Sequence, residues 1–316
     1  MIVTELNRQN SARIALKKQL RTLFKNYGGK LRWDEPLARY TSLKVGGPAD
    51  LMVFPRSVAE VSTLMQTLSK HRLPYFVLGG GSNLLIKSGG IEGVVIHLKH
   101  LNRAKRLDAT QLQADAGLSY PKLAIYAMEQ GLSGLEFAAG IPGMVGGAVV
   151  MNAGIPRQET APLLTSVTLV DKAGESREIP AKALSFAYRS SELPKGVIVS
   201  AVFALTPAPP ENVEQRMKAY LKRRQETQPL SFSNCGSVFK NPEGLHAGRL
   251  IEQAGLKGYQ IGDAQISERH GNFIINRGAA QAEDCLALIK KMQETVLDLF
   301  GIVLELEVKV IGQDEY

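Results

Sequence analysis

Cysteine is scarce in this sequence, because its 316 residues include only Cys235 and Cys285. Two cysteines are too few for a disulfide framework or a cysteine-rich zinc site, and they suit a reducing compartment. The patterns His-Glu-x-x-His, Cys-x-x-Cys and Gly-x-Ser-x-Gly are missing, and so is the Walker phosphate loop. These absences argue against zinc chemistry and the common serine nucleophiles, and they disfavour ATP-driven chemistry.

The sequence also lacks an apolar leader and a convincing membrane span. Residues 1–10 carry Glu5 and Arg8 where a secretory signal needs an apolar segment. No charge occurs between Glu136 and Arg157, but the glycines and prolines there are poor material for a spanning helix. We expect a soluble cytoplasmic chain without membrane insertion, in which this stretch forms a buried loop system.

Charge is distributed unevenly along the chain. The formal net charge is +8, and residues 1–32 supply +7 of it, with eight basic side chains against Glu5. The periodicity over residues 12–27 predicts a basic amphipathic helix, ended by Gly28. A packing helix with a solvated basic face is favoured over a nucleic-acid or membrane-binding arm.

Length and patterning indicate two or three domains that mix helices and strands. Short buried strands and amphipathic helices alternate in the first two-thirds, and a proline-rich segment at 207–210 is a plausible linker. A clean alternation predicts a final strand over 304–310. The other expected strands are 51–54, 74–78, 94–98, 166–170 and 197–205, and the other helices begin at Ser57, Ser119, Glu211 and Gln281.

Glycine is abundant, with 30 residues, and two glycine-rich loops stand out. Residues 79–83 follow a strand, and their small side chains let backbone N–H groups form a cradle for anionic oxygens, although alone they fit a tight turn. Residues 134–154 interleave glycine with apolar side chains, which gives a compact backbone that a large flat ligand can approach. Together the two loops favour a dinucleotide-sized ligand.

Three polar features in the second half are candidates for chemistry. Arg189 lies between an aromatic residue and two serines, Ser237 lies in a polar segment around Gly236, and Glu307 lies on the polar face of the last expected strand. Each alone also fits a surface arginine, a turn or a solvent-facing carboxylate. His246 and His270 are isolated, and we interpret them as ordinary polar residues.

Taken together, these segments resemble the UDP-N-acetylenolpyruvoylglucosamine reductase family. The resemblance covers residue 40 to the C-terminus, and its segments occur in the family's order. The matching segments are 40–50, 78–85, 134–154, 188–191, 236–242, 247–258 and 306–309.

The resemblance implies an α+β fold with a two-lobed FAD-binding domain of the vanillyl-alcohol-oxidase-like (PCMH) type and a C-terminal α+β substrate-binding domain. The expected divisions are a basic helical extension at 1–32, an FAD-binding domain at 33–207 with lobes at about 33–98 and 99–207, and a substrate-binding domain at 208–316. It also implies non-covalent FAD, held by Gly79, Gly80, Gly81, Ser82, Asn83, Gly140, Pro142, Gly143, Gly146 and Gly147.

The implied reaction has two stages, in which NADPH reduces the flavin and the enolpyruvyl substrate then accepts a hydride and a proton. Hydride addition builds negative charge toward the substrate carboxylate, so the site needs fixed positive charge and a placed proton. On the resemblance, Arg189 stabilises this charge and Ser237 donates the proton. Glu307 orients the substrate or assists protonation.

The resemblance further places Asn241 against the substrate. Lys240 is close to Ser237 in sequence, and on that ground we expect it to assist Ser237 and to contact the substrate. The chain lacks the tyrosine-bearing loop that one class of the family inserts after Leu205. Arg223 and Arg224 are the candidate replacements for it at the UDP diphosphate, although a solvated helix face explains them equally well.

We expect a monomer without bound metal or nucleic acid. NADPH as co-substrate rests on the resemblance alone. Two alternatives remain: an FAD-dependent oxidase or dehydrogenase of the wider superfamily with another substrate, and a non-catalytic basic polyanion-binding protein.

Overall fold

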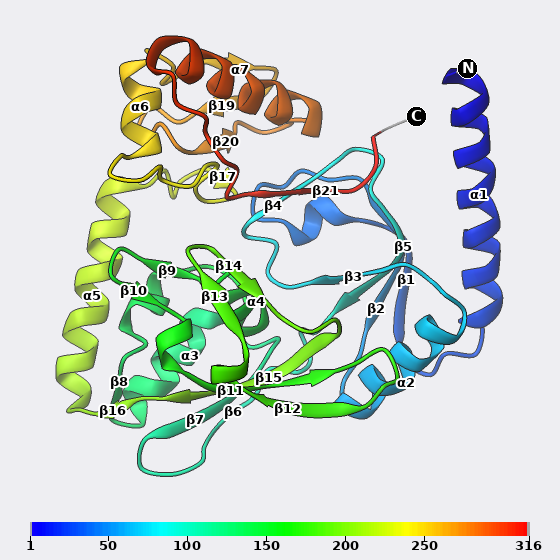
Figure 1. Ribbon diagram of the computed structural model, residues 1–316, viewed down its shortest axis with the longest axis horizontal. Helices are drawn as coiled ribbons and strands as arrows, with labels where there is room; N and C mark the ends of the chain where they lie inside the picture. The colour runs from blue at the N-terminus through cyan, green and yellow to red at the C-terminus, as the bar shows by residue number, and fades with distance from the viewer. Residues whose placement is uncertain (1, 315–316) are drawn as a thin grey trace.

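The computed structural model describes residues 2–314, with side chains from residue 11 onward. Figure 1 shows two sheet-containing lobes, a C-terminal domain above them, and a long N-terminal helix along one side. Helices and strands are mixed throughout, so the expected α+β fold class is confirmed. No helix among the described residues has the length and apolar character needed to cross a membrane.

The first lobe is built on a four-stranded sheet of order β1-β2-β5-β3. β1 pairs with β2 in antiparallel fashion, whereas β2–β5 and β5–β3 are parallel. The neighbouring strands β2 and β5 are almost entirely buried, which explains their nearly continuous apolar runs, whereas β3 is only partly buried. The elements of this lobe are β1 (Lys30–Pro36), β2 (Pro48–Phe54), α2 (Val58–Lys70), β3 (Tyr75–Leu78), β4 (Leu84–Ile86) and β5 (Ile91–His97).

Helix α2 begins as its sequence predicts. The Ser57 side chain accepts a hydrogen bond from the backbone N–H of Glu60, and the Glu60 carboxylate accepts one from the N–H of Arg56. Both ends of this local motif are therefore satisfied.

Helix α1 (Ile2–Leu23) is longer than the helix expected over 12–27 and ends four residues earlier. Its basic side chains dock it on the first lobe. Arg13 pairs with Asp50 at 2.8 Å, Lys17 lies 3.3 Å from the same carboxylate, and Lys17 and Arg21 both pair with Asp34. These ion pairs attach the basic face of α1 to the first lobe.

The second lobe is an antiparallel five-stranded sheet of order β12-β11-β15-β7-β6, flanked by short helices and hairpins. Its sheet strands are β6 (Ala104–Arg106), β7 (Gln111–Asp115), β11 (Leu164–Val170), β12 (Ser176–Pro180) and β15 (Val197–Ala204). Its helices are α3 (Tyr120–Glu129) and α4 (Val145–Val150), and its small pairs are β8 (Leu132–Ser133) with β16 (Thr206–Pro207), β9 (Gly154–Ile155) with β10 (Gln158–Glu159), and β13 (Ser185–Ala187) with β14 (Ser190–Glu192).

Helix α5 (Pro210–Thr227) runs along the opposite side of the molecule from α1 and leads into the C-terminal domain (Figure 1). This domain has a four-stranded antiparallel sheet of order β17-β20-β19-β18 with two helices. Its elements are β17 (Ser233–Asn234), α6 (Ala247–Gln253), β18 (Gln260–Ile261), β19 (Ala264–Ile266), β20 (Ile274–Asn276) and α7 (Ala282–Phe300).

The strand expected over 304–310 is wrong for most of its length. Leu306 forms an isolated bridge with Phe239, and a strand, β21 (Lys309–Ile311), begins only at Lys309, where it pairs in parallel with β4. The segment changes partners as it passes from the C-terminal domain to the first lobe, so no single neighbour continues its ladder. The alternation of inward side chains persists, with Leu304 and Val308 buried.

Candidate active site

A cavity of about 860 Å³ lies where the two lobes and the C-terminal domain meet. Its walls include β3 of the first lobe, α4 of the second lobe and the segment around Gly236 of the C-terminal domain. Both predicted glycine loops line it, as do Arg189, Ser237 and Glu307. Gly79 and Glu307, which are 228 positions apart in sequence, therefore lie at one site. The cavity has the volume expected of a site for a large nucleotide.

The first glycine loop is held by close backbone approaches that only glycine allows. Gly81 has φ of +60°, and a Cβ there would collide with the carbonyl oxygen of Tyr40. A Cβ on Gly80 would come within 2.8 Å of the Cα of Gly143, so the two glycine loops touch directly. The Ser82 hydroxyl joins them as well, because it donates to the carbonyl of Pro142 at 2.9 Å.

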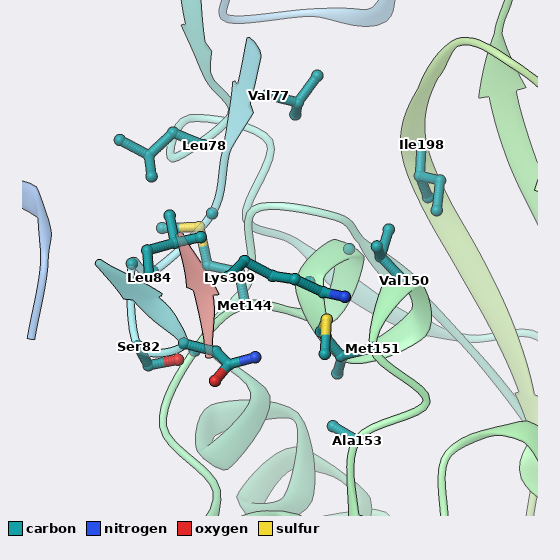
Figure 2. A pocket seen from close by; sticks show the side chains of 18 of the residues that line it. Val77, Leu78, Ser82, Leu84, Met144, Val150, Met151, Ala153, Ile198 and Lys309 are labelled. Atoms are coloured by element: carbon teal, nitrogen blue, oxygen red, sulfur yellow. The ribbon is translucent and has the colours of Figure 1, made fainter. Parts of the chain in front are cut away.

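The second loop leaves open space at its helical end, which fits a flat cofactor. A Cβ on Gly147, in α4, would meet no atom within 4 Å, although this residue lines the cavity. Figure 2 shows apolar side chains around the pocket, among them Val77, Leu78, Val150 and Ile198. Open backbone beside apolar walls suits a flavin ring, and the first loop offers backbone N–H groups to a diphosphate. The residues present thus fit FAD.

Of the ten residues expected at the cofactor, nine line the cavity, and Gly140 does not. A Cβ on Gly140 would instead lie 3.7 Å from the Arg224 side chain. The backbone turns toward the cavity at the next residues, because Ile141 and Pro142 both line it.

Lys309 lines the cavity, although its sequence pattern was not predicted to form part of the site. Figure 2 shows its side chain extending into the pocket. Its backbone N–H donates to the carbonyl of Asn83 at 3.0 Å, and the Asn83 amide donates to the carbonyl of Glu307 at 3.0 Å. Lys309 shares a face with Glu307 in the alternating pattern, and that spacing was the signal that could have identified it.

Arg189 occupies the turn of the β13–β14 hairpin with φ of +56°, an uncommon conformation for a residue with a side chain. Its Nε donates to Glu307 Oε1 at 3.2 Å, and its Nη2 donates to the carbonyl of Gly154 at 2.8 Å. Its Nη1 lies 3.5 Å from Glu159 and is buried without a hydrogen-bond partner among the described residues. All three nitrogens of the guanidinium therefore face partners within the protein, and the side chain as a whole lines the cavity.

Glu307 is mostly buried, with 17% of its side chain exposed. Burial raises the pKa of its carboxyl above the ordinary value, and the nearby charges of Arg189 and Lys240 partly oppose this rise. Glu307 can consequently keep a proton at a higher pH than an exposed glutamate.

Ser237 follows a turn in which Gly236 has φ of +78°. The Asn234 side chain accepts a hydrogen bond from the backbone N–H of Gly236 at 3.0 Å, and the Ser42 hydroxyl donates to the Asn234 carbonyl at 2.6 Å. The backbone N–H of Ser42 also donates to the carbonyl of Gly81 in the first glycine loop. Ser42 thus connects the two segments that carry the cofactor cradle and Ser237.

The expected substrate residues lie outside the cavity lining. Lys240 pairs with Glu305 at 3.3 Å, and the Asn241 side chain accepts from the N–H of Ala247 at 3.0 Å, at the start of α6. In α5, Arg223 is exposed, and Arg224 donates to Gln228 at 2.9 Å.

Comparison with known proteins defines the class first. Residues 49–179 match the protein family described as an FAD binding domain. This match covers most of both lobes and includes both glycine loops, which line the cavity. The chain is an FAD-dependent oxidoreductase.

The particular family follows from the remainder of the chain. Residues 228–311 match the family described as UDP-N-acetylenolpyruvoylglucosamine reductase, C-terminal domain. A relative of that name from Geotalea uraniireducens is 44% identical over 90% of this chain and 95% of its own length, and one from Symbiobacterium thermophilum is 42% identical over 95% and 98%. The crystal structure of the reductase from Thermus caldophilus superposes with a TM-score of 0.76 at 37% identity, covering 89% of this chain and 98% of that one. The chain belongs to the UDP-N-acetylenolpyruvoylglucosamine reductase family.

Proposed function

We propose that this chain reduces UDP-N-acetyl-3-O-(1-carboxyvinyl)-glucosamine to UDP-N-acetylmuramate, a step of peptidoglycan precursor synthesis, with NADPH as the reductant. The observation that carries the proposal is the arrangement of Arg189, Glu307 and Ser237 at one FAD cavity. Arg189 lines this cavity with a charged guanidinium, which suits a carboxylate ligand. FAD held by the two glycine loops would supply the hydride chemistry that connects NADPH with the enolpyruvyl carbon.

The protein's part is to hold charge and protons around the substrate. The Arg189 guanidinium binds the substrate carboxylate and stabilises the negative charge that develops on it. Glu307, in its protonated form, donates a hydrogen bond to the substrate and avoids placing a second negative charge there. Ser237 donates the proton to the carbon next to the carboxylate, Lys240, three residues further along the chain, compensates the resulting alkoxide, and solvent returns the proton to Ser237.

Residues beside the cavity extend the proposal to the sugar nucleotide. Lys240 and Asn241 contact the substrate from the C-terminal domain, and Arg223 and Arg224 bind its diphosphate. Support for the α5 arginines comes from Arg224, whose side chain packs beside Gly140, next to cavity residues Ile141 and Pro142.

The proposed setting is a cytoplasmic monomer that uses small-molecule partners and no nucleic acid. Both cysteines are free and buried, which suits a reducing compartment. Three basic side chains of α1, those of Arg13, Lys17 and Arg21, are paired with Asp50 and Asp34, which leaves fewer charges to attract a polyanion.

Ser237→Ala tests the chemical role directly. NADPH should still bleach the flavin of the purified holoenzyme at the wild-type rate, because hydride transfer to FAD needs no proton from Ser237. Flavin reoxidation by the enolpyruvyl substrate should slow by roughly 10²- to 10⁴-fold. Stopped-flow absorbance of the flavin measures both steps.

Ser191→Ala is the matched control for this test. Ser191 lines the same cavity, but its hydroxyl donates to the carbonyl of Val150 at 2.7 Å and is not available as a proton donor. Unchanged reoxidation in Ser237→Ala would remove Ser237 from the proposed role. The proposed substrate would be refuted if the reduced flavin of the wild-type enzyme were reoxidised by air but not by the enolpyruvyl sugar nucleotide.

A further inference from the structure

We propose that Glu159 is a positioning residue that holds the Arg189 guanidinium in its working orientation, and that Asn152 holds Glu159 in turn. The inference rests on the proposed function, in which Arg189 binds the reacting end of the substrate. Asn152 lies in the glycine-rich segment 134–154, Glu159 lies outside the segments that match the family, and both residues follow α4 in the chain.

The three nitrogens of Arg189 have different environments. Nε is committed to Glu307, and Nη2 is committed to the carbonyl of Gly154. Nη1 lies 3.5 Å from the Glu159 carboxylate, close enough for charge attraction, yet it makes no hydrogen bond among the described residues. Glu159 therefore attracts this nitrogen by charge and holds the guanidinium toward the β9–β10 hairpin.

Glu159 is itself fixed by a buried amide. Asn152 is only 1% exposed and has φ of +41°, a conformation that asparagine tolerates better than most residues. Its Nδ2 donates to Glu159 Oε2 at 2.8 Å and to the carbonyl of Ala187 at 3.1 Å, and its Oδ1 accepts from the N–H of Ala161 at 2.9 Å. Both amide protons are used, so this side chain has one well-defined orientation.

This network joins the two hairpins that hold the arginine. Gly154 and Glu159 are opposite residues of the β9–β10 hairpin, and both contact Arg189. Ala187 lies two residues before Arg189 in the other hairpin, and Asn152 binds its carbonyl. A long flexible side chain at a hairpin turn loses much conformational entropy when it is held still, and the network supplies that restraint in advance.

Glu159 also prevents Glu307 from being the sole partner of the arginine. The charged groups around Glu307 are Arg189 from the hairpin turn, Lys240 from the segment beside it and Lys309 two residues along the chain. With two carboxylates sharing Arg189, the guanidinium is balanced between them. Without Glu159, Arg189 would pair fully with Glu307, which favours the ionised form of that acid.

Glu159→Gln tests the proposal, because it keeps the shape of the side chain and removes its charge. In stopped-flow experiments on the holoenzyme, reduction of the flavin by NADPH should stay within about twofold of wild type, whereas reoxidation by the enolpyruvyl substrate should slow by roughly 10- to 100-fold. The loss of reoxidation at high pH should also begin at a lower pH than in wild type, since Glu307 ionises more easily.

Two further variants complete the design. Glu192→Gln is the matched control, because Glu192 is exposed on the same β13–β14 hairpin, and it should behave as wild type in both steps. Asn152→Gly accepts the positive φ without strain and removes only the amide, so it should impair reoxidation in the same way as Glu159→Gln. It also tests the network should Glu159→Gln fold poorly.

Wild-type reoxidation rates in Glu159→Gln would overturn the proposal, and so would equal slowing of both steps together with a lower melting temperature. If reoxidation in Glu159→Gln were lost at a higher pH than in wild type, that result would contradict the proposal that Glu159 and Glu307 share Arg189. Failure of the wild-type enzyme to transfer hydride to the enolpyruvyl substrate would instead refute the proposed function, so the two failures are distinguishable.

Discussion

Single residues in unusual environments determine much of this site. Arg189 adopts a left-handed backbone conformation at a hairpin turn, and its side chain reaches Glu307, 118 residues away. Strain of this kind persists where neighbouring contacts over-determine it, and here those contacts come from Gly154, Glu159 and Glu307. The arginine is therefore already oriented before a substrate arrives.

His97 is a second residue with an unusual environment. It ends β5, opposite Leu78 and directly behind the first glycine loop, with its ring 5.5 Å from that of Tyr40 and 5.7 Å from that of Phe54. It is 5% exposed, and burial, aided by the charge of Lys99, lowers its pKa from 6.5 to about 4. His97 is thus neutral in the folded protein across the physiological range.

Because His97 is neutral in the folded protein, we expect the free energy of unfolding to depend on pH. As pH falls below 6.5 the unfolded chain binds a proton at His97, whereas the folded protein does not until about pH 4. Relative to His97→Phe, the free energy of unfolding of the wild-type protein should fall by up to about 3 kcal/mol between these two pH values. Urea unfolding at a pH above 6.5 and at a pH near 4 measures the difference.

His246→Phe is the control for that measurement, because His246 is exposed at the start of α6. It should retain the pH dependence of wild type. An identical pH dependence in His97→Phe would show that His97 binds its proton equally well in the folded and unfolded chain.

At the scale of elements, α1 explains where the excess positive charge belongs. Three basic residues one helical turn apart, Arg13, Lys17 and Arg21, face the carboxylates of Asp50 and Asp34. Asp50 is fully buried and also accepts a hydrogen bond from the N–H of Gly93 in β5. The helix is therefore an integral part of the first lobe.

Asp50→Asn should loosen this helix. The substitution leaves Arg13 and Lys17 without their buried anion, so we expect the free energy of unfolding to fall by about 1–3 kcal/mol. Amide hydrogen exchange in α1 should rise at the same time. Asp34→Asn is the matched control, since Asp34 is 45% exposed and its ion pairs contribute less than about 1 kcal/mol. Equal effects of the two substitutions would contradict this account of docking.

At the scale of the whole molecule, hydrophobic cores do not follow the sequence divisions. The core beneath the C-terminal sheet contains Leu43, Val45 and Leu85 from the first lobe together with Phe239 and residues of α7. The Asn276 amide in β20 donates to the carbonyl of Leu43 at 3.0 Å, and β21 returns to pair with β4. The domain boundary expected between residues 207 and 208 stays a prediction. One hydrophobic core contains residues from both sides of this boundary.

Leu43→Ala should therefore destabilise the C-terminal domain, although Leu43 lies far from it in sequence. Leu43 is 1% exposed, and its truncation should cost about 2–5 kcal/mol. Hydrogen exchange should increase mainly in α7 and its sheet. Leu37→Ala is the control, because fully buried Leu37 belongs to a separate core in the first lobe and should increase exchange there. The opposite pattern would show that the cores are not shared in this way.

Local features of the structure could be predicted from the sequence. The Ser57 cap, most strands and the two glycine loops have local sequence patterns that identify them, and the family resemblance supplied FAD and the expected roles of Arg189, Ser237 and Glu307. The prediction of a continuous strand over 304–310 was wrong because this segment pairs with two different neighbours, Phe239 and β4. Glu159 and Lys309 were missed because their roles depend on partners outside their own segments.

The sequence by itself thus determined the class of the protein and the positions of its glycine loops, since glycine spacing, caps and apolar periodicity are local properties of the chain. Only the tertiary structure decided that the two loops touch at Gly80 and Gly143, and that Arg189 lies between Glu307 and Glu159. These contacts join residues that the backbone brings together only after its sheets have packed. The same packing pairs three of the basic residues in 1–32, Arg13, Lys17 and Arg21, with Asp50 and Asp34, and these pairs attach α1 to the first lobe.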